Sequence, residues 1–163
     1  DLVVLGKGLS GGYAPLGAVL VGPRVAAAFE EEPFDHGYTF GGHPGSCAAA
    51  LEVLRLIEAE GLVAAAERQG AVLLSGLKDL AARVPGAGPV EGLGLLASLG
   101  LRLGGAARQR LETALLRRGL IAYVSEEGVT LAPPLSVTGT ELAFALERLE
   151  QGLGDFAAGG DHG

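Results

Sequence analysis

Several residue types are rare or absent in the sequence, and these shortages exclude particular kinds of cross-link, metal site and partner. It contains no methionine and no tryptophan, and Cys47 is its single cysteine. One cysteine can form neither an intrachain disulfide nor a cysteine-based zinc site. Lysine and arginine total 12 against 19 acidic residues, which gives a net charge of −7 and a pI near 4.9. Because the chain is acidic and has no basic tract, we expect no nucleic-acid partner.

Long hydrophobic runs are also absent. Gly, Arg or Glu interrupts each apolar stretch well before the ~18 residues that a membrane-spanning helix needs. The sequence does not open with a basic leader and an apolar stretch, so we expect no membrane association and a cytoplasmic location. It begins without methionine, directly in the apolar run Leu2–Leu5. We therefore expect the chain to be a fragment that lacks its N-terminal part.

The chain is nevertheless rich in apolar residues and in glycine: 48% of it is hydrophobic, and 28 of its 163 residues are glycine. Apolar runs at residues 2–5 and 16–21 predict strands that are buried on both faces of a parallel sheet. A glycine-dense loop over residues 6–12 joins them. A short helix over residues 24–32 and a longer one over residues 44–60 follow, the latter with proline in its first turn.

From residue 62 onward the pattern switches between helices and strands. The Thr-x-x-Glu spacing of Thr138 and Glu141 predicts a capping box at the start of the last helix. The expected elements are a helix over 62–84, a turn over 85–89, a strand over 99–103, a helix over 106–118, strands over 120–124 and 129–131, and a helix over 141–149. We predict part of an α/β domain over residues 1–61, a small α+β domain over residues 62–153, and a disordered tail over residues 154–163.

Lys7 is the residue whose position favours chemistry. It follows a predicted strand directly and lies between Gly6 and Gly8, where a bulky group can approach the backbone closely. Loops at the carboxyl ends of strands are where open α/β sheets bind ligands. A desolvated lysine is a nucleophile that forms Schiff bases with carbonyl compounds. The alternative is an exposed loop lysine without function. Lys78, the only other lysine, is expected on the solvated face of a helix.

Four other residues suggest chemistry less strongly. His36 and His43 lie seven residues apart without an acidic partner at ligand spacing, so we expect no metal site. Cys47, at the start of an alanine-rich helix, is expected to be a small buried hydrophobic residue. Thr39, considered alone, is most simply a loop residue that bonds its own backbone.

Three ordered segments together resemble the class III (ω-type) pyridoxal-phosphate-dependent aminotransferases. Residues 1–18, DLVVLGKGLSGGYAPLGA, are similar to the family's segment around its cofactor-binding lysine. Residues 36–54, HGYTFGGHPGSCAAALEVL, lie at the appropriate distance downstream. Residues 131–135, LAPPL, resemble the family's C-terminal signature. The resemblance extends to about residue 153 and covers the C-terminal portion of the family only.

The resemblance implies a fold, a cofactor and two site residues. The fold would be fold type I of the pyridoxal-phosphate-dependent transferases, with a partial large domain over 1–61 and the small α+β domain over 62–153. Lys7 would hold pyridoxal 5'-phosphate as a Schiff base in a dry pocket and then shuttle a proton. Thr39 would bind the cofactor phosphate of the neighbouring subunit in a homodimer. Tyr13, Tyr38 and Phe40 would lie near the substrate entrance or serve packing alone.

The substrates implied are an amine or amino-acid donor and a keto-acid or aldehyde acceptor. Many relatives have arginine where this chain has Glu91, and several amino-acid-specific members have a carboxylate-binding arginine where it has Thr130. A bidentate clamp for a carboxylate is therefore not evident. These departures favour amine or ω-amino donors.

Two alternatives to an aminotransferase stay open at this point. Another fold-type I enzyme, an aminomutase or a decarboxylase, would use the same scaffold, and a non-catalytic fragment would only dimerise. In the family, the aspartate that pairs with the pyridine nitrogen and a phosphate-binding loop precede the lysine, and neither is in these residues. We therefore expect the 163-residue chain alone to be inactive, with a mobile or self-associating first part.

Overall fold

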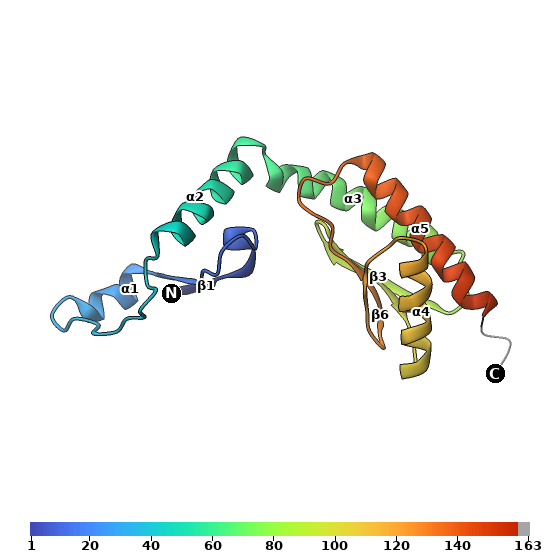
Figure 1. Cartoon of the computed structure of the whole chain (residues 1–163), viewed down its shortest axis with the longest axis horizontal. Coiled ribbons are helices and arrows are strands. Elements are labelled where there is room, and N and C mark those ends of the chain that lie inside the picture. Colours follow the sequence, from blue (N-terminus) through green and yellow to red (C-terminus); the bar gives the residue numbers. More distant parts are fainter. Residues whose placement is uncertain (160–163) are drawn as a thin grey trace. The chain divides into compact units, whose positions relative to one another are not determined.

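A computed structural model describes residues 1–159 of the chain. They form two compact units, the first made of residues 1–61 and the second beginning at residue 62. Figure 1 shows the elements of each unit in sequence colours. Among the described residues, no helix has the length and apolarity needed to cross a membrane.

The first unit is built on a two-stranded sheet. Strand β1 (Leu2–Leu5) pairs with β2 (Ala18–Val21) in antiparallel register, with Leu2 opposite Val21 and Leu5 opposite Ala18. The prediction that these runs belong to a parallel arrangement is wrong for this pair. Parallel neighbours are usually joined by a helix that carries the chain back along the sheet. The connection over residues 6–17 has no α-helix and contains only the 3₁₀ turn η1 (Lys7–Ser10), so the chain reverses direction.

Residues 1–61 alone do not bury the first strand on both faces. Leu2, Val3 and Val4 expose 56%, 53% and 77% of their surface. Only Leu5 and Ala18 at one end of the hairpin are half-buried, and the one long helix of residues 1–61 packs against η1. The strand propensity of the apolar run was predictable, whereas its burial depends on material that the unit does not supply.

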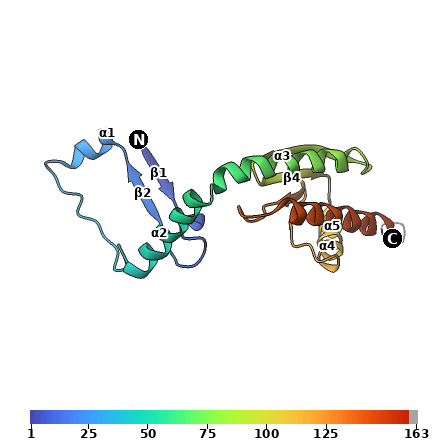
Figure 2. The same ribbon diagram turned by 90° about the horizontal axis from the view of Figure 1, so that it is seen from above.

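Helices α1 (Pro23–Ala26) and α2 (Pro44–Ala59) complete the first unit, and both are visible beside β1 and β2 in Figure 2. The helix expected over 24–32 ends early, passing into the 3₁₀ turn η2 (Ala27–Phe29). The helix expected from Pro44 is confirmed, with proline at its first position and His43 as its N-cap. The backbone N–H of Ser46 donates to Nδ1 of His43 at 3.2 Å.

The second unit contains three helices and a four-stranded antiparallel sheet. The strands lie in the order β3-β4-β6-β5. The elements are α3 (Leu62–Ala81), β3 (Ala87–Leu93), β4 (Leu96–Leu101), α4 (Gly105–Arg117), β5 (Tyr123–Val124), β6 (Gly128–Leu131) and α5 (Gly139–Ala158). The prediction missed β3, because glycine and proline over residues 85–89 are typical of a turn. An edge strand tolerates proline, and a register shift between Ala87 and Val90 accommodates it.

The core of the second unit lies between one face of this sheet and the three helices. Alternate residues of β4, among them Ala97 and Leu99, are buried against leucines of all three helices. The helical members of this core are Leu73, Leu77, Leu80, Leu111, Leu115, Leu142, Leu149 and Leu153. Ser98 and Gly100, between the buried residues of β4, are only half-buried. The opposite face of the sheet therefore carries no helix of this unit.

The last helix corrects the predicted tail. Residues 154–163 were expected to be disordered, but α5 continues to Ala158. The helical period continues past Leu149: Leu153 is 4% exposed, and Phe156 packs against the core. This continued burial explains the extra helical turns. Residues 160–163 lie outside the described residues.

Two helical glycines of the second unit have opposite surroundings and should respond oppositely to alanine. A Cβ on Gly70 of α3 would lie 2.3 Å from the backbone oxygen of Gly94, whereas one on Gly154 of α5 would meet nothing within 4 Å. We expect Gly70→Ala to destabilise the unit by about 1–3 kcal/mol, because backbone cannot move aside as a side chain can. Gly154→Ala should stabilise it by roughly 0.5–1 kcal/mol. Urea unfolding of both variants measures the difference, and a neutral Gly70→Ala would contradict the packing described.

The capping box of α5 gives a prediction for the dependence of stability on pH. The backbone N–H of Thr138 and then its hydroxyl donate to Glu141, and these bonds lower the pKa of that carboxyl. A carboxyl whose pKa is lower in the folded state stabilises the fold above its unfolded pKa and loses that contribution as the pH falls through the folded pKa. Glu141→Gln should thus be less stable than the wild type at neutral pH.

The same two proteins should converge in acid, where the protonated carboxyl resembles the amide. Urea unfolding at neutral pH and below the folded pKa of Glu141 tests this. Thr138→Ala, which removes the side-chain cap of α5, should cost about 0.5–2 kcal/mol. A Glu141→Gln difference that persists unchanged in acid would exclude the carboxylate as its source.

Candidate functional site

The backbone of Lys7 has an unusual conformation. Its φ is 48°, and within residues 1–159 it is the only residue other than glycine with a positive φ. Non-glycine residues in the left-handed region cost of the order of 1–3 kcal/mol and cluster at functional sites. Gly6 precedes Lys7 in an extended conformation, and Gly11 closes the turn with φ 59°. The loop therefore keeps a strained lysine where glycine would be the easier choice.

Helix α2 and a buried serine hold this turn in place. Ser10 at the end of η1 is 2% exposed, and its hydroxyl donates to the backbone oxygen of Ala14. η1 packs against α2, and a Cβ on Gly11 would lie 3.2 Å from a methyl group of Val53. Small residues thus let the loop approach the helix closely. This packing supplies the restraint that a strained lysine requires.

The side chain of Lys7 is accessible. It is exposed and makes no salt bridge with the described residues. A Cβ on Gly8 or Gly12 would meet nothing within 4 Å, so the first unit leaves room for a bulky group beside the amine. The dry pocket expected around Lys7 is not formed by residues 1–61. Lys78, by contrast, lies exposed on α3 as expected.

Thr39 lies in the turn that precedes α2. The backbone N–H of Gly41 donates to the oxygen of Tyr38 at 2.9 Å, and that of His43 donates to the oxygen of Phe40 at 3.2 Å. Thr39 is exposed, and its hydroxyl makes no hydrogen bond within the described part of the chain. The expectation that it bonds its own backbone is therefore wrong. The turn presents an unused hydroxyl to solvent.

A series of aromatic rings gives the segment before this turn its structure. Ring centroids lie 5.3 Å apart for Phe29 and Phe34, 5.4 Å for Phe34 and His36, and 4.8 Å for His36 and Tyr38. His36 therefore makes tilted and edge-to-face contacts with Phe34 and Tyr38, and His43 is a helix cap. Over the described residues, no three His, Cys, Asp or Glu side chains are placed to hold a metal ion.

Lys7 and Thr39 belong to the same unit but to separate segments of it. No hydrogen bond joins them or their immediate neighbours among residues 1–61. The first unit thus presents an amine and a hydroxyl at two places, rather than in one pocket. Sequence reasoning singled out both residues but gave no sign of the strained backbone of Lys7.

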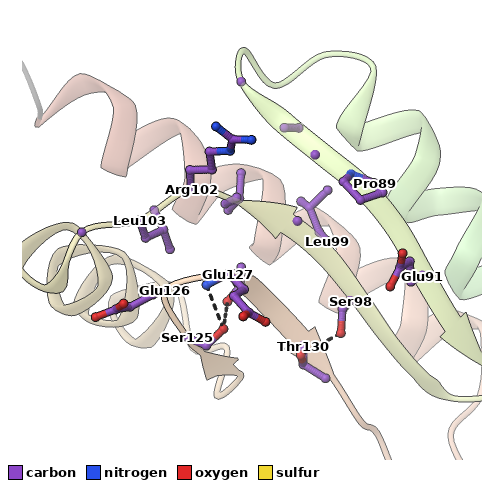
Figure 3. A pocket seen from close by; sticks show the side chains of 17 residues that line it. Pro89, Glu91, Ser98, Leu99, Arg102, Leu103, Ser125, Glu126, Glu127 and Thr130 are labelled. Atoms are coloured by element: carbon purple, nitrogen blue, oxygen red, sulfur yellow. Dashed lines mark hydrogen bonds between the residues drawn. The ribbon is translucent and has the colours of Figure 1, made fainter.

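The second unit carries a groove on the helix-free face of its sheet. The groove has a volume of about 920 Å³, and Figure 3 shows Glu91, Ser98 and Thr130 side by side within it. The hydroxyls of Ser98 and Thr130 lie 2.8 Å apart. Arg102 is the only lysine or arginine among the lining residues. The sequence indicated that Glu91 and Thr130 depart from arginine, but only the register shows that both flank Ser98.

Comparison with known proteins assigns the chain to a family. The profile of the family described as "Aminotransferase class-III" matches residues 1–153. A diaminobutyrate–2-oxoglutarate transaminase from Halomonas elongata is 37% identical over 94% of this chain and 36% of its own length. An acetylornithine aminotransferase from Prochlorococcus marinus is 40% identical over 96% of this chain and 37% of its own length.

Solved structures show the same similarity in three dimensions. An amine transaminase from an uncultivated Pseudomonas species, solved in its PLP-bound form, is 36% identical with a TM-score of 0.90, over 95% of this chain and 38% of its own. An (S)-enantioselective ω-transaminase from Thermomicrobium roseum is 34% identical with a TM-score of 0.88, over 96% of this chain and 37% of its own. The chain thus spans little more than a third of the length of these proteins.

Proposed function

Because the chain belongs to the class III aminotransferase family, we propose that it contributes the reactive lysine to an enzyme that transfers amino groups. The fold is the corresponding part of fold type I. We assign residues 1–61 to the cofactor-binding large domain and residues 62–153 to the small α+β domain. The donor would be an amine or amino acid, and the acceptor a keto acid or aldehyde. The relatives named above are all transaminases, so an aminomutase or decarboxylase is not favoured.

One observation carries this proposal, the placement of Lys7. Its backbone has φ 48°, it lies between two glycines just after β1, and its side chain is exposed. A lysine that serves only solubility needs no strained backbone, because any exposed position would do. The family profile matches residues 1–153, a range that includes Lys7.

The cofactor that the family implies is pyridoxal 5'-phosphate, and the residues present suit it. When bound, this cofactor supplies an electron sink that stabilises a carbanion at the substrate. The Nζ of Lys7 would hold the cofactor by condensation with its aldehyde, whose oxygen leaves as water. Once the substrate amine has displaced it, the free amine of Lys7 would carry a proton between the substrate carbon and the cofactor. Lysine suits this role because its amine alternates between neutral and protonated forms. The glycines beside it leave the room that a ring needs.

Thr39 would bind the cofactor phosphate of a neighbouring subunit. Its hydroxyl is unused within the described residues and exposed on a turn, where a hydroxyl and a backbone N–H can both donate to an anion. The rings beside it support a subunit interface, since Tyr38 and Phe40 expose 78% and 76% of their surface. Contact between subunits would cover these rings. We therefore propose a homodimer whose active sites lie at the interface, in the cytoplasm.

The departures at Glu91 and Thr130 bear on the donor. The relatives named for diaminobutyrate and acetylornithine act on amino acids by name. In this chain, neither of the two positions carries a guanidinium that could clamp a carboxylate. We propose that the donors are amines or ω-amino compounds. The 163-residue chain on its own is expected to be inactive, because Lys7 is only one of the groups that transamination needs.

The attachment of the cofactor can be mapped directly. Borohydride reduction of the protein that carries this chain, isolated with pyridoxal phosphate, should fix the cofactor on the peptide that contains Lys7. Lys78 is a matched control, being the only other lysine and equally exposed. Peptide mass spectrometry measures the distribution. Label on Lys78 alone would rule out the assignment of Lys7.

Substitution of Lys7 by arginine tests whether the site needs the reactive amine of the lysine or only its positive charge. Lys7→Arg keeps a positive charge at this position, but the guanidinium stays protonated and cannot attach to an aldehyde. We expect transamination to be abolished, whereas Lys78→Arg should leave it unchanged. Assays of amino transfer by both variants provide the test. A Lys7→Arg variant with normal turnover would show that another amine carries the cofactor.

Thr39→Val should weaken cofactor binding without abolishing it. Loss of one hydrogen bond to a charged group costs roughly 1.5–3 kcal/mol, which corresponds to an affinity loss on the order of 10- to 150-fold. Thr113→Val is the matched control, because the Thr113 hydroxyl donates to Gln109 within α4. Titration of each apoprotein with pyridoxal phosphate gives the affinities. Equal affinities for the two variants would remove Thr39 from the site.

Mixed dimers test the sharing of Thr39 between subunits. A dimer of one Lys7→Ala subunit and one Thr39→Val subunit should contain one site with both defects and one with neither. It should show about half of the wild-type activity with wild-type cofactor affinity at the intact site. If Thr39 served its own subunit, the remaining active site would instead bind the cofactor weakly.

A further inference from the structure

A separate groove lies between helices α4 and α5 of the second unit, which pack against each other (Figure 1). Gly152 of α5 permits the close approach, because a Cβ there would lie 2.5 Å from a methyl group of Leu115. The guanidinium of Arg118 also joins the two helices, donating to the two carboxylate oxygens of Asp155 at 2.6 and 2.7 Å. Packing and an ion pair therefore hold both walls of the groove, which has a volume of about 560 Å³.

The charge of this groove is positive, although the chain as a whole has a net charge of −7. Of the four arginines over residues 105–118, Arg108 and Arg118 are paired with carboxylates. Arg110 and Arg117 form no salt bridge within the described residues, and both line the groove. The one acidic residue of its described lining, Asp155, is already bound through both oxygens to Arg118. Two positive charges therefore remain in excess.

The spacing of Arg110 and Arg117 brings both side chains to one ligand. Residues seven apart lie almost two turns apart on one face of a helix, at about 10.5 Å along its axis. Thr113 lies between them, and its hydroxyl donates to the backbone oxygen of Gln109 at 2.9 Å. The two guanidiniums are thus the charged groups that flank this stretch of the groove. A guanidinium donates hydrogen bonds and accepts none, so the pair selects an anion.

The number of donors favours a phosphate over a carboxylate. Each guanidinium presents a planar fork of N–H groups that matches the oxygens of either anion. A carboxylate has two oxygens and a single charge, so one fork satisfies it. A phosphate monoester has three acceptor oxygens and a charge of about −1.5 to −2 at neutral pH, so it accepts from two forks at once.

An apolar wall beside the arginines suits an organic group on that phosphate. Phe156 is half-buried, and its ring centroid lies 5.6 Å from the guanidinium carbon of Arg110, which orders that side chain at the edge of the groove. Ala106 and Ala114 add small apolar surfaces from α4. One end of the lining is therefore cationic and the remainder is largely apolar.

We infer that this groove binds a small organic phosphate, with its phosphate between Arg110 and Arg117 and its organic part against Phe156. A volume of about 560 Å³ lies within the range of small-molecule sites. An acidic peptide would instead need a row of cations longer than two. The site uses residues of the second unit only, so the inference does not depend on the proposed function of Lys7.

NMR titration of the 163-residue chain with phenyl phosphate tests the inference. We expect saturable shifts of the amide signals of Arg110, Thr113 and Arg117, and an affinity that falls with added salt. Benzyl alcohol, which has the ring without the charge, should leave these signals unchanged. Benzoate and inorganic phosphate, which lack the phosphate and the ring respectively, should both bind more weakly. Equal affinity for inorganic phosphate, or tighter binding of a tetraglutamate peptide, would overturn the inference of an organic phosphate.

Three variants make the result specific. Arg117→Gln should weaken the binding of phenyl phosphate on the order of tenfold or more. Arg110→Lys, which keeps the charge but loses the fork, should weaken it by a smaller factor. Arg68→Gln is the matched control, since Arg68 is an exposed arginine of α3 without a salt bridge in the described part of the chain, and should change nothing. Unchanged signal dispersion shows that each variant folds. Equal affinity in Arg117→Gln and Arg68→Gln would refute the site.

Discussion

The strained backbone of Lys7 is the constraint on which the candidate site depends. A lysine at φ 48° persists only where its surroundings hold it, and here an antiparallel hairpin and helix α2 do so. The buried Ser10 ties the turn to Ala14, and small residues let it lie against the helix. The cost of this conformation is met by packing rather than by bonds to the lysine itself. Its amine is consequently left unpaired and accessible, as a nucleophile requires.

The second unit is organised by a different constraint, the close packing of helices on one face of a sheet. Glycine at position 70 lets α3 approach the turn at Gly94, and leucines from three helices fill the space above β4. The buried apolar side chains of the sheet therefore lie on its helix-packed face. The other side keeps polar residues in register and a groove floored by glycine. One face of the sheet thus carries the core, and the other face stays free of helices.

Features that depend on residues close together in the sequence were predicted. Features that depend on pairing between distant segments were not. The Pro44 helix and the Thr138 capping box follow from residue types at fixed spacing, and both are confirmed. Strand β3 was missed because its glycine and proline are typical of a turn, and only pairing at a sheet edge overrides that tendency. Lys7 stood out because of its glycine neighbours. Its positive φ was not predictable, because lysine has no intrinsic preference for that region.

Transfer of nitrogen from donor to acceptor is the measurement that tests the central claim most directly. The protein that carries this chain, loaded with pyridoxal phosphate, would receive a ¹⁵N-labelled primary amine and an unlabelled keto acid. If the chain contributes Lys7 to an aminotransferase, NMR should find the label in the amino acid formed from the keto acid, with the donor converted to a carbonyl compound. Retention of the label in a decarboxylated or rearranged donor, or its release as ammonia alone, would contradict the account.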